Sequence, residues 1–346
     1  MPYISRLSAG TYRVQWRDGA GRRHSKTFAT ERIARHYGEE READVRKGAF
    51  TDPRQGRVKL AEWHREWWES RVVEQSTERV DAGRIRLHIL PEFGDVPIAD
   101  IAHSQVQAWV KRLVRSGLAG DTVRSCHRLL ASMLAAAVRD GRIVNNVAKD
   151  VELPPAGIGH EVYLTRDEVH AVVERMEDET FRLAVLVLAY TGLRWGELAG
   201  LHRKRINLPA QTLDVVEVLD RSGEIKGYPK SAARRTVPIA EPAAVPLSLY
   251  IERRRPKAAD LLLTGVRGAP LSGVRFGRAW HTARVAAGVK YARPHDLRHT
   301  CASWLVQAGV PLLDVQRMLG HASYSTTLRY AHLAPGTYDS IRAALD

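Results

Sequence analysis

Two short segments rich in proline and glycine divide this chain into three stretches with different hydrophobic periods. Such residues interrupt helices and strands, so residues 50–56 and 152–159 are predicted to be linkers. A chain of 346 residues also exceeds the length of a common single domain. We therefore expect a multidomain protein, mainly α-helical with small β-sheets, divided into 1–56, 57–150, a linker at 151–160, and 161–346.

The first stretch combines alternating polarity with turn residues and a helix signal. Polar and apolar side chains alternate from Thr11 to Trp16, residues 18–21 favour a turn, and residues 23–28 return as a second strand. Thr30 can then cap a helix that runs to about Lys47. The pattern predicts a small ββ(β)α unit. Residues 1–56 hold twelve Lys/Arg against seven Asp/Glu, and a basic sheet can enter a DNA major groove. An accessory domain without that contact is the alternative.

The second stretch has helical periodicity. Apolar residues recur at helical spacing within 60–68, 106–113 and 123–138, and their aromatic side chains are expected in a core. A helical domain is therefore predicted for 57–150.

The third stretch mixes both periods. Thr165 and Glu168 form a capping box, and the apolar run Leu183–Tyr190 predicts a buried helix. Residues 213–218 and 235–239 read as strands, and helices return from about residue 272. An α+β domain is expected for 161–346.

The charge and the cysteine content of the chain limit the kinds of partner and of metal or disulfide site that it can have. The chain has 53 Lys+Arg against 39 Asp+Glu, a net charge of +14, which favours a polyanion as partner, with nucleic acid first and an anionic membrane second. Its two cysteines lie too far apart in sequence to suggest a disulfide framework or a zinc site. The longest apolar run has eight residues, short of a bilayer span, and residues 1–10 lack the pattern of a signal peptide. We expect a cytoplasmic protein with no membrane partner.

A basic protein can attack a phosphodiester in two ways: with metals held on clustered carboxylates, or with Arg, Lys and His around the phosphate and a side-chain nucleophile. The acidic run 177–179 is interpreted as a solvated turn, and no Gly-rich loop followed by Lys-Ser/Thr is present to hold ATP. The sequence therefore favours chemistry without cofactor or metal.

The run His295–Thr300, HDLRHT, provides groups of the second kind. His295, Arg298 and His299 share one face of a predicted helix that starts after Pro294, so an imidazole and a guanidinium can converge on one anion. Two alternatives stay open. The spacing of His295 and His299 suits a metal but lacks the Glu of the metalloprotease motif, and a purely structural helix start fits as well.

Three further features accompany this run: TGLRWGEL at 191–198, LGH at 319–321, and Tyr330 nine residues after His321. Together they resemble the tyrosine recombinase (phage integrase) family, whose pattern is Arg, a hairpin Lys, His-x-x-Arg, His or Trp, and Tyr. The resemblance covers most of 161–346. It implies the following catalytic residues: Arg194, Lys230, His295, Arg298, His321 and the nucleophile Tyr330.

Two of these positions have rivals. Lys230 stands shortly before an R-x-V-P strand, as in the family, and Lys226 lies four residues earlier. Tyr330 fits the family wording T-x-x-Y-x-H, which Tyr324 and Tyr338 do not.

The resemblance also implies a role for each group. Arg194 and Arg298 would hold the two non-bridging phosphate oxygens. Lys230 would protonate the leaving 5′ oxygen, His295 would handle the tyrosine proton, and His321 would hydrogen-bond a phosphate oxygen. Glu197 would orient the site by bracing a basic neighbour, or would be a plain helix carboxylate.

The implied function is site-specific recombination through a 3′-phosphotyrosine link, by an integrase of a prophage or mobile element. Residues 57–150 would be the core-binding (SAM-like) domain and 1–56 an arm-type DNA-binding domain. The implied partners are double-stranded DNA at core and arm sites, a homotetramer on that DNA, and a directionality factor or host bending protein. The alternatives are a type IB topoisomerase-like relaxing enzyme and a non-catalytic DNA-binding regulator.

Overall fold

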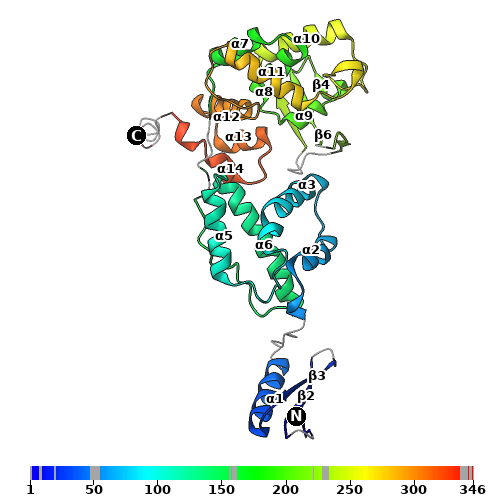
Figure 1. Cartoon of the computed structure of the whole chain (residues 1–346). Helices are drawn as coiled ribbons and strands as arrows, with labels where there is room; N and C mark the ends of the chain where they lie inside the picture. The colour runs from blue at the N-terminus through cyan, green and yellow to red at the C-terminus, as the bar shows by residue number, and fades with distance from the viewer. Residues whose placement is uncertain are drawn as a thin grey trace. The chain divides into compact units, whose positions relative to one another are not determined.

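The computed structural model describes residues 2–7, 10–18, 21–46, 55–155, 157, 162–220, 222–227, 234–335, 342 and 345. The chain divides into two compact units, Met1–Ile158 and Gly159–Asp346. Small sheets and many helices confirm the predicted fold class (Figure 1). Within the described ranges, no helix combines the length and apolar character needed to cross a bilayer.

The N-terminal part of the first unit is a three-stranded antiparallel sheet with one helix. β1 (Tyr3–Arg6), β2 (Tyr12–Arg17) and β3 (Arg23–Phe28) pair in that order, and α1 (Glu31–Arg46) follows. Alternation along β2 buries Val14 and Trp16 beside Ala34 of α1. Thr30 accepts a hydrogen bond from the Ile33 amide at 3.4 Å, as expected of a helix cap. The other side of β2 is left to polar side chains.

The remainder of the first unit is helical. It contains η1 (Gln55–Arg57), α2 (Leu60–Glu69), α3 (Gln75–Arg84), a π-helical turn η2 (Ile85–Ile89), α4 (Leu90–Phe93), α5 (His103–Arg115) and α6 (Gly120–Arg139). The prediction that its aromatics are core residues is confirmed for Trp63, Trp67 and Trp109, which are buried. The indole N–H groups of Trp63 and Trp109 donate to the Met133 and His88 carbonyls, so burial leaves neither donor unpaired.

The second unit is built around one buried helix. It begins with α7 (Arg166–Arg175), the buried helix α8 (Glu179–Thr191), α9 (Trp195–Ala199) and η3 (Arg203–Arg205). The strands are β4 (Ile206–Asn207), β5 (Thr212–Val215), β6 (Val218–Leu219), β7 (Ile225–Lys226) and β8 (Arg235–Pro238). They form two sheets, β4-β5-β8 and β6-β7.

Helices return after β8: α10 (Glu241–Arg254), η4 (Val266–Gly268), α11 (Gly273–Ala286), α12 (Asp296–Gln307), α13 (Leu312–Leu319), α14 (Tyr324–Leu328) and η5 (Ala331–Leu333). α8 packs against α7, α10 and α12, and α13 contacts both α12 and α14 (Figure 1). This packing brings the C-terminal motifs next to the end of α8.

One predicted strand is interrupted. Residues 213–218 were expected to be continuous, but β5 ends at Val215 and β6 starts at Val218 in a separate sheet. Glu217, in the break, accepts hydrogen bonds from Arg205 at 3.0 Å and pairs with His202 at 2.8 Å. These charge-assisted contacts satisfy the carboxylate outside the sheet.

Candidate active site

Arg298 is a buried residue of the predicted site and is held by two backbone carbonyls. It lies in the first turns of α12, is 3% exposed, and donates to the Gly192 and Leu319 carbonyls, both at 2.7 Å. Those carbonyls belong to the C-terminal ends of α8 and α13, where the helix dipole favours a cation. Burial first, and then the charge of Arg194, lower the pKa of Arg298 to about 9. The side chain therefore remains charged at neutral pH in a fixed position.

Arg194 reaches the same turn from the start of α9. Its Nη2 donates to the Gly320 carbonyl at 3.4 Å, one residue after the carbonyl that Arg298 contacts, and its Nη1 donates to Glu197 at 3.0 Å. Glu197 also accepts from the Arg194 backbone N–H at 2.9 Å, which fixes the first turn of α9. The two predicted arginines thus converge on adjacent residues.

Two glycines make this convergence possible. Gly192 has φ +66°, and a Cβ there would lie 2.4 Å from Leu319 Cδ2. Gly320 has φ +68°, and a Cβ there would lie 2.9 Å from the guanidinium of Arg235. Both residues adopt the left-handed backbone conformation at a place with no room for a side chain. Only glycine meets both conditions, which explains the glycines of the motifs TGLR and LGH.

Glu197 is shared by two arginines. Besides Arg194, Arg235 of β8 donates to its two oxygens at 3.1 and 2.7 Å and, through Nε, to the Met318 carbonyl at 2.8 Å. Burial would raise the pKa of Glu197, but the hydrogen bonds and charges of Arg235 and Arg194 outweigh it and hold that pKa below its usual value. The carboxylate therefore stays ionised and braces basic groups on both sides.

Arg235 was not among the predicted site residues. The signal was present in the strand pattern, because Val237 is buried and period-2 alternation places Arg235 on the same face. Its side chain is only 6% exposed. A buried arginine on a strand needs a carboxylate partner, and Glu197 is that partner.

For the DNA cleavage that the family resemblance implies, we expect Arg235→Lys to slow the reaction by about tenfold at saturating DNA, because Lys cannot make the two-pronged contact that holds Glu197. The cleavage rate, the DNA affinity and the melting temperature should be measured together. The matched control is Arg234→Lys at the exposed neighbouring position. Equal rates for wild type and Arg235→Lys would remove the positioning role.

The predicted histidines His295 and His321 lie beside these arginines. Desolvation, followed by the charges of His299 and Arg298, lowers the pKa of His295 to about 4 although the side chain reaches solvent. Burial and the charges of Arg298 and Arg194 lower the pKa of His321 to about 3. Both rings are neutral at pH 7 in the DNA-free protein. His321 Nδ1 is hydrogen-bonded to Thr327 Oγ1 at 2.9 Å, which fixes its orientation.

Tyr330 is 1% exposed and packs with Leu319 of α13 and Val306 of α12. Its hydroxyl lies 2.6 Å from Nδ1 of His299, for which no separate role was predicted. The phenol is therefore in the same cluster as the arginines and histidines. Of the rival tyrosines, Tyr324 is 44% exposed, and Tyr338 lies outside the described residues.

The lysine assignment lies beyond what the structure describes. Lys230 is outside the described residues. Its rival Lys226, in β7, forms an ion pair with Asp220 at 2.8 Å and is about half exposed.

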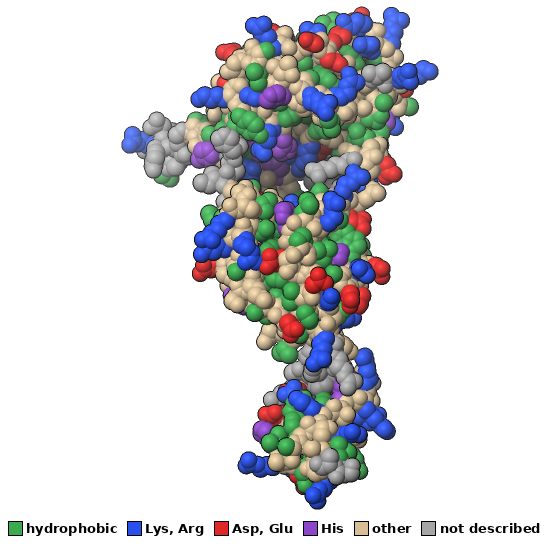
Figure 2. Space-filling model, in the orientation of Figure 1, with side chains coloured by type: hydrophobic (Ala, Val, Ile, Leu, Met, Phe, Trp, Pro, Cys, Tyr) green, Lys and Arg blue, Asp and Glu red, His purple; other side chains and the backbone are tan. Residues whose placement is uncertain are grey.

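The cluster as a whole is cationic. Arg194 and Arg235 bind the carboxylate of Glu197, and Arg298 lies close enough to be affected by its charge. Figure 2 shows Lys, Arg and His side chains in the lower part of the second unit, where Figure 1 places α12 and α13. Guanidinium groups match phosphate geometry, so the arrangement suits a backbone phosphate. No group of three or more His, Cys, Asp or Glu that could hold a metal occurs among the residues the structure describes.

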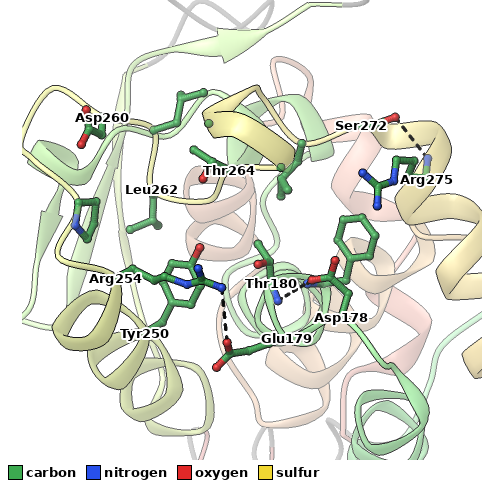
Figure 3. Close-up of a pocket in the computed structure, with 16 residues that line it drawn as sticks. Asp178, Glu179, Thr180, Tyr250, Arg254, Asp260, Leu262, Thr264, Ser272 and Arg275 are labelled. Atoms are coloured by element: carbon green, nitrogen blue, oxygen red, sulfur yellow. Dashed lines mark hydrogen bonds and ion pairs between the residues drawn. The ribbon is translucent and has the colours of Figure 1, made fainter.

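A cavity of about 690 Å³ lies elsewhere in the second unit, at the N-terminal ends of α8 and α11 (Figure 3). Asp178 and Ser272 cap the two helices, and Glu179 pairs with Arg253 and Arg254. Among the described residues, no predicted catalytic residue lines this cavity.

Comparison with known proteins gives a consistent result along the chain. Residues 162–336 match the model described as the phage integrase family, and residues 59–114 match the phage integrase N-terminal SAM-like domain. The tyrosine recombinase XerD of Pseudomonas aeruginosa is 31% identical over 238 residues, covering 65% of this chain and 76% of XerD. The integrase of Mycobacterium phage FRAT1 is 28% identical over 284 residues, covering 79% and 83%.

Solved structures show the same fold. The Tn1549 transposon integrase, in complex with a circular intermediate DNA, superposes with a TM-score of 0.70 at 24% identity, covering 83% of this chain and 99% of that one. A lambda integrase dimer bound to a COC′ core site gives a TM-score of 0.67 at 20% identity, covering 96% and 95%.

Proposed function

This chain belongs to the phage integrase family and is a site-specific recombinase, and we propose that Tyr330 is its nucleophile and that it integrates or excises a prophage or mobile element. The observation that carries the proposal is the convergence of Arg194 and Arg298 on the turn at residues 319–320. Tyr330 packs against α13, the helix that ends at this turn. A regulator that only binds DNA has no need for two arginines and a tyrosine gathered at one buried turn.

The arginines supply charge stabilisation. Arg194 and Arg298 hold the non-bridging oxygens of the scissile phosphate and counter the charge that builds up in the transition state. Glu197, itself held by Arg235, keeps the guanidinium of Arg194 in place, and the Gly192 and Leu319 carbonyls hold that of Arg298. His321 donates a further hydrogen bond to a phosphate oxygen.

The reaction conserves bond energy. A neighbouring imidazole takes the proton of the Tyr330 hydroxyl, and the phenolic oxygen bonds to phosphorus. The bond to the 5′ oxygen breaks, and Lys230 protonates that oxygen. The products are a 3′-phosphotyrosine link and a free 5′ hydroxyl. Rejoining reverses these steps, so the cycle consumes neither ATP nor metal.

The substrate and assembly follow from the family. The partner is double-stranded DNA, contacted at core sites by the helical part of the first unit and the second unit, and four copies act on two sites. A directionality factor or host bending protein would choose between integration and excision. The reaction takes place in the cytoplasm, on nucleoid DNA.

The N-terminal sheet is proposed to read arm-type sites. Arg13, Gln15 and Arg17 are exposed on one face of β2, opposite the face that buries Val14, and Arg23 pairs with Arg17 on β3. This polar, basic face has the width and chemistry to enter a major groove.

Replacing Arg13 and Arg23 together by Ala should reduce the slope of log affinity against log salt concentration by about 2, because two phosphate contacts are lost. Arg35→Ala on α1 is the control, since that side chain pairs with Glu31 on the helix. An unchanged slope in the double variant would rule out this face as the DNA contact.

The function is tested by covalent capture. The protein is mixed with a pool of nicked duplexes of randomised sequence, and DNA that stays attached in denaturing detergent is recovered and sequenced. A recombinase gives adducts with one recurring site. Binding without adduct supports a regulator, and relaxation of supercoiled plasmid without paired sites supports a topoisomerase.

A further inference from the structure

The hydroxyl of Tyr330 lies 2.6 Å from Nδ1 of His299. The ring centroids of His299 and Tyr330 are 6.0 Å apart, and the ring planes are inclined at 47°. The imidazole therefore approaches the edge of the phenol ring that carries the hydroxyl. A distance of 2.6 Å is at the short end for a hydrogen bond to a hydroxyl. If the phenol donates, Nδ1 accepts and the ring proton of neutral His299 is on Nε2.

His299 is held rigidly at this place. It follows Arg298, whose guanidinium is fixed by two backbone carbonyls, and precedes Thr300, whose hydroxyl accepts from the Leu164 amide at 3.0 Å. Both neighbours are buried within α12. The backbone of His299 is therefore fixed within the helix that carries Arg298, and the hydrogen bond to Tyr330 orients its imidazole.

His295 occupies a different position. Its ring meets the ring of His299 edge-on, with centroids 5.1 Å apart and planes at 88°. His299 thus has the Tyr330 hydroxyl at one ring nitrogen and His295 against the ring. The sequence-based expectation assigned the tyrosine proton to His295, whereas the described contact to the hydroxyl is made by His299.

The pair also belongs to the charged cluster. Tyr330 lies close enough to Arg298 to affect the pKa of that arginine. His299 likewise affects the pKa of His295 and the pKa of His321. The phenolic oxygen is therefore on the side of Tyr330 that faces the phosphate-binding groups.

We propose that His299 is a further catalytic residue, the group that accepts the Tyr330 proton, an inference that rests on the proposed function. A phenol has a pKa near 10, so it attacks phosphorus poorly at neutral pH unless a base takes its proton. The O–H bond of Tyr330 breaks, the proton moves to Nδ1 of His299, and the phenolic oxygen bonds to phosphorus. The bond to the 5′ oxygen breaks and that oxygen takes a proton from Lys230. In rejoining, the imidazolium of His299 returns its proton to Tyr330. On this assignment His295 does not take the tyrosine proton and is available to contact the phosphate.

Two variants separate proton transfer from positioning. His299→Asn places an amide oxygen close to where Nδ1 lies, so it keeps a hydrogen-bond acceptor but cannot take the proton. His299→Ala removes both. His295→Asn tests the rival histidine, and His281→Asn on α11 is the control. Melting temperatures identify any variant that does not fold.

The assay uses the nicked duplex identified by covalent capture, with either the natural 5′ oxygen or a 5′ sulfur at the scissile phosphate. A thiolate leaves without protonation, so a defect at the leaving group is relieved by sulfur and a defect at the nucleophile is not. We expect both His299 variants to form adduct about 10²–10⁴-fold more slowly on both substrates. His295→Asn should be slowed less than His299→Asn, and Lys230→Ala should recover only with sulfur.

Other outcomes overturn the inference. Wild-type rates for folded His299→Asn, recovery of that variant with sulfur, or a larger loss in His295→Asn would each remove His299 as the proton acceptor while leaving the recombinase intact. If the wild-type protein forms no adduct on either substrate, the proposed function itself fails, and this inference fails with it.

Discussion

Tyr330→Phe is expected to abolish the covalent protein–DNA adduct while DNA binding remains. The change removes the one oxygen that can attack phosphorus and leaves the packing of the ring against Leu319 and Val306 in place. The lost hydrogen bond to His299 should cost about 1 kcal/mol of folding stability. Adduct is measured on denaturing gels with the nicked duplex, and affinity by gel shift.

Tyr324→Phe is the matched control, because this tyrosine is exposed at the start of α14 and should react as wild type. If Tyr330→Phe still forms the adduct and Tyr324→Phe does not, the nucleophile is Tyr324 and not Tyr330.

Changing Arg298 should also have a large effect. Arg298→Lys keeps a positive charge but loses the planar fork, so we expect cleavage to fall about 10²–10³-fold, the cost of one lost transition-state donor. Arg298→Ala should also destabilise the fold by about 1–3 kcal/mol, since the buried carbonyls of Gly192 and Leu319 lose their donor. Single-turnover cleavage at saturating protein isolates the chemical step.

Arg317→Lys is the control for this pair of variants. Arg317 lies on α13, is largely exposed and pairs only weakly with Asp314 at 3.2 Å. If folded Arg298→Lys cleaves as fast as Arg317→Lys, Arg298 does not act on the phosphate.

Periodicity was enough to predict most of the fold. The alternation in β2 reflects burial of one face of the strand, and the apolar run of α8 reflects burial of the helix on all sides. Both patterns are local properties of the sequence. The break between β5 and β6 was missed because Val216 and Val218 on either side of Glu217 continue the β-branched composition of the strand. Only the positions of His202 and Arg205, which come from another part of the fold, explain why Glu217 leaves the sheet.

The site was predictable where a motif carried it. The glycines of TGLR and LGH, Arg298 and Tyr330 were all picked out by motifs, and the structure brings them together at the ends of α8 and α13. The roles of Arg235 and His299 were not predicted, because each depends on a contact between distant segments: Arg235 with Glu197, and His299 with Tyr330. The sequence places His295, Arg298 and His299 on one helical face but does not say which imidazole meets the phenol.

The most direct test is to identify the residue that carries the DNA. Captured adduct is digested with trypsin and nuclease, and the modified peptide is sequenced by mass spectrometry. We predict a nucleotide phosphate on Tyr330, in the peptide that runs from Tyr330 to Arg342 and also contains Tyr338. A modification on Tyr338, on Tyr324 or on a residue that is not tyrosine would contradict the account.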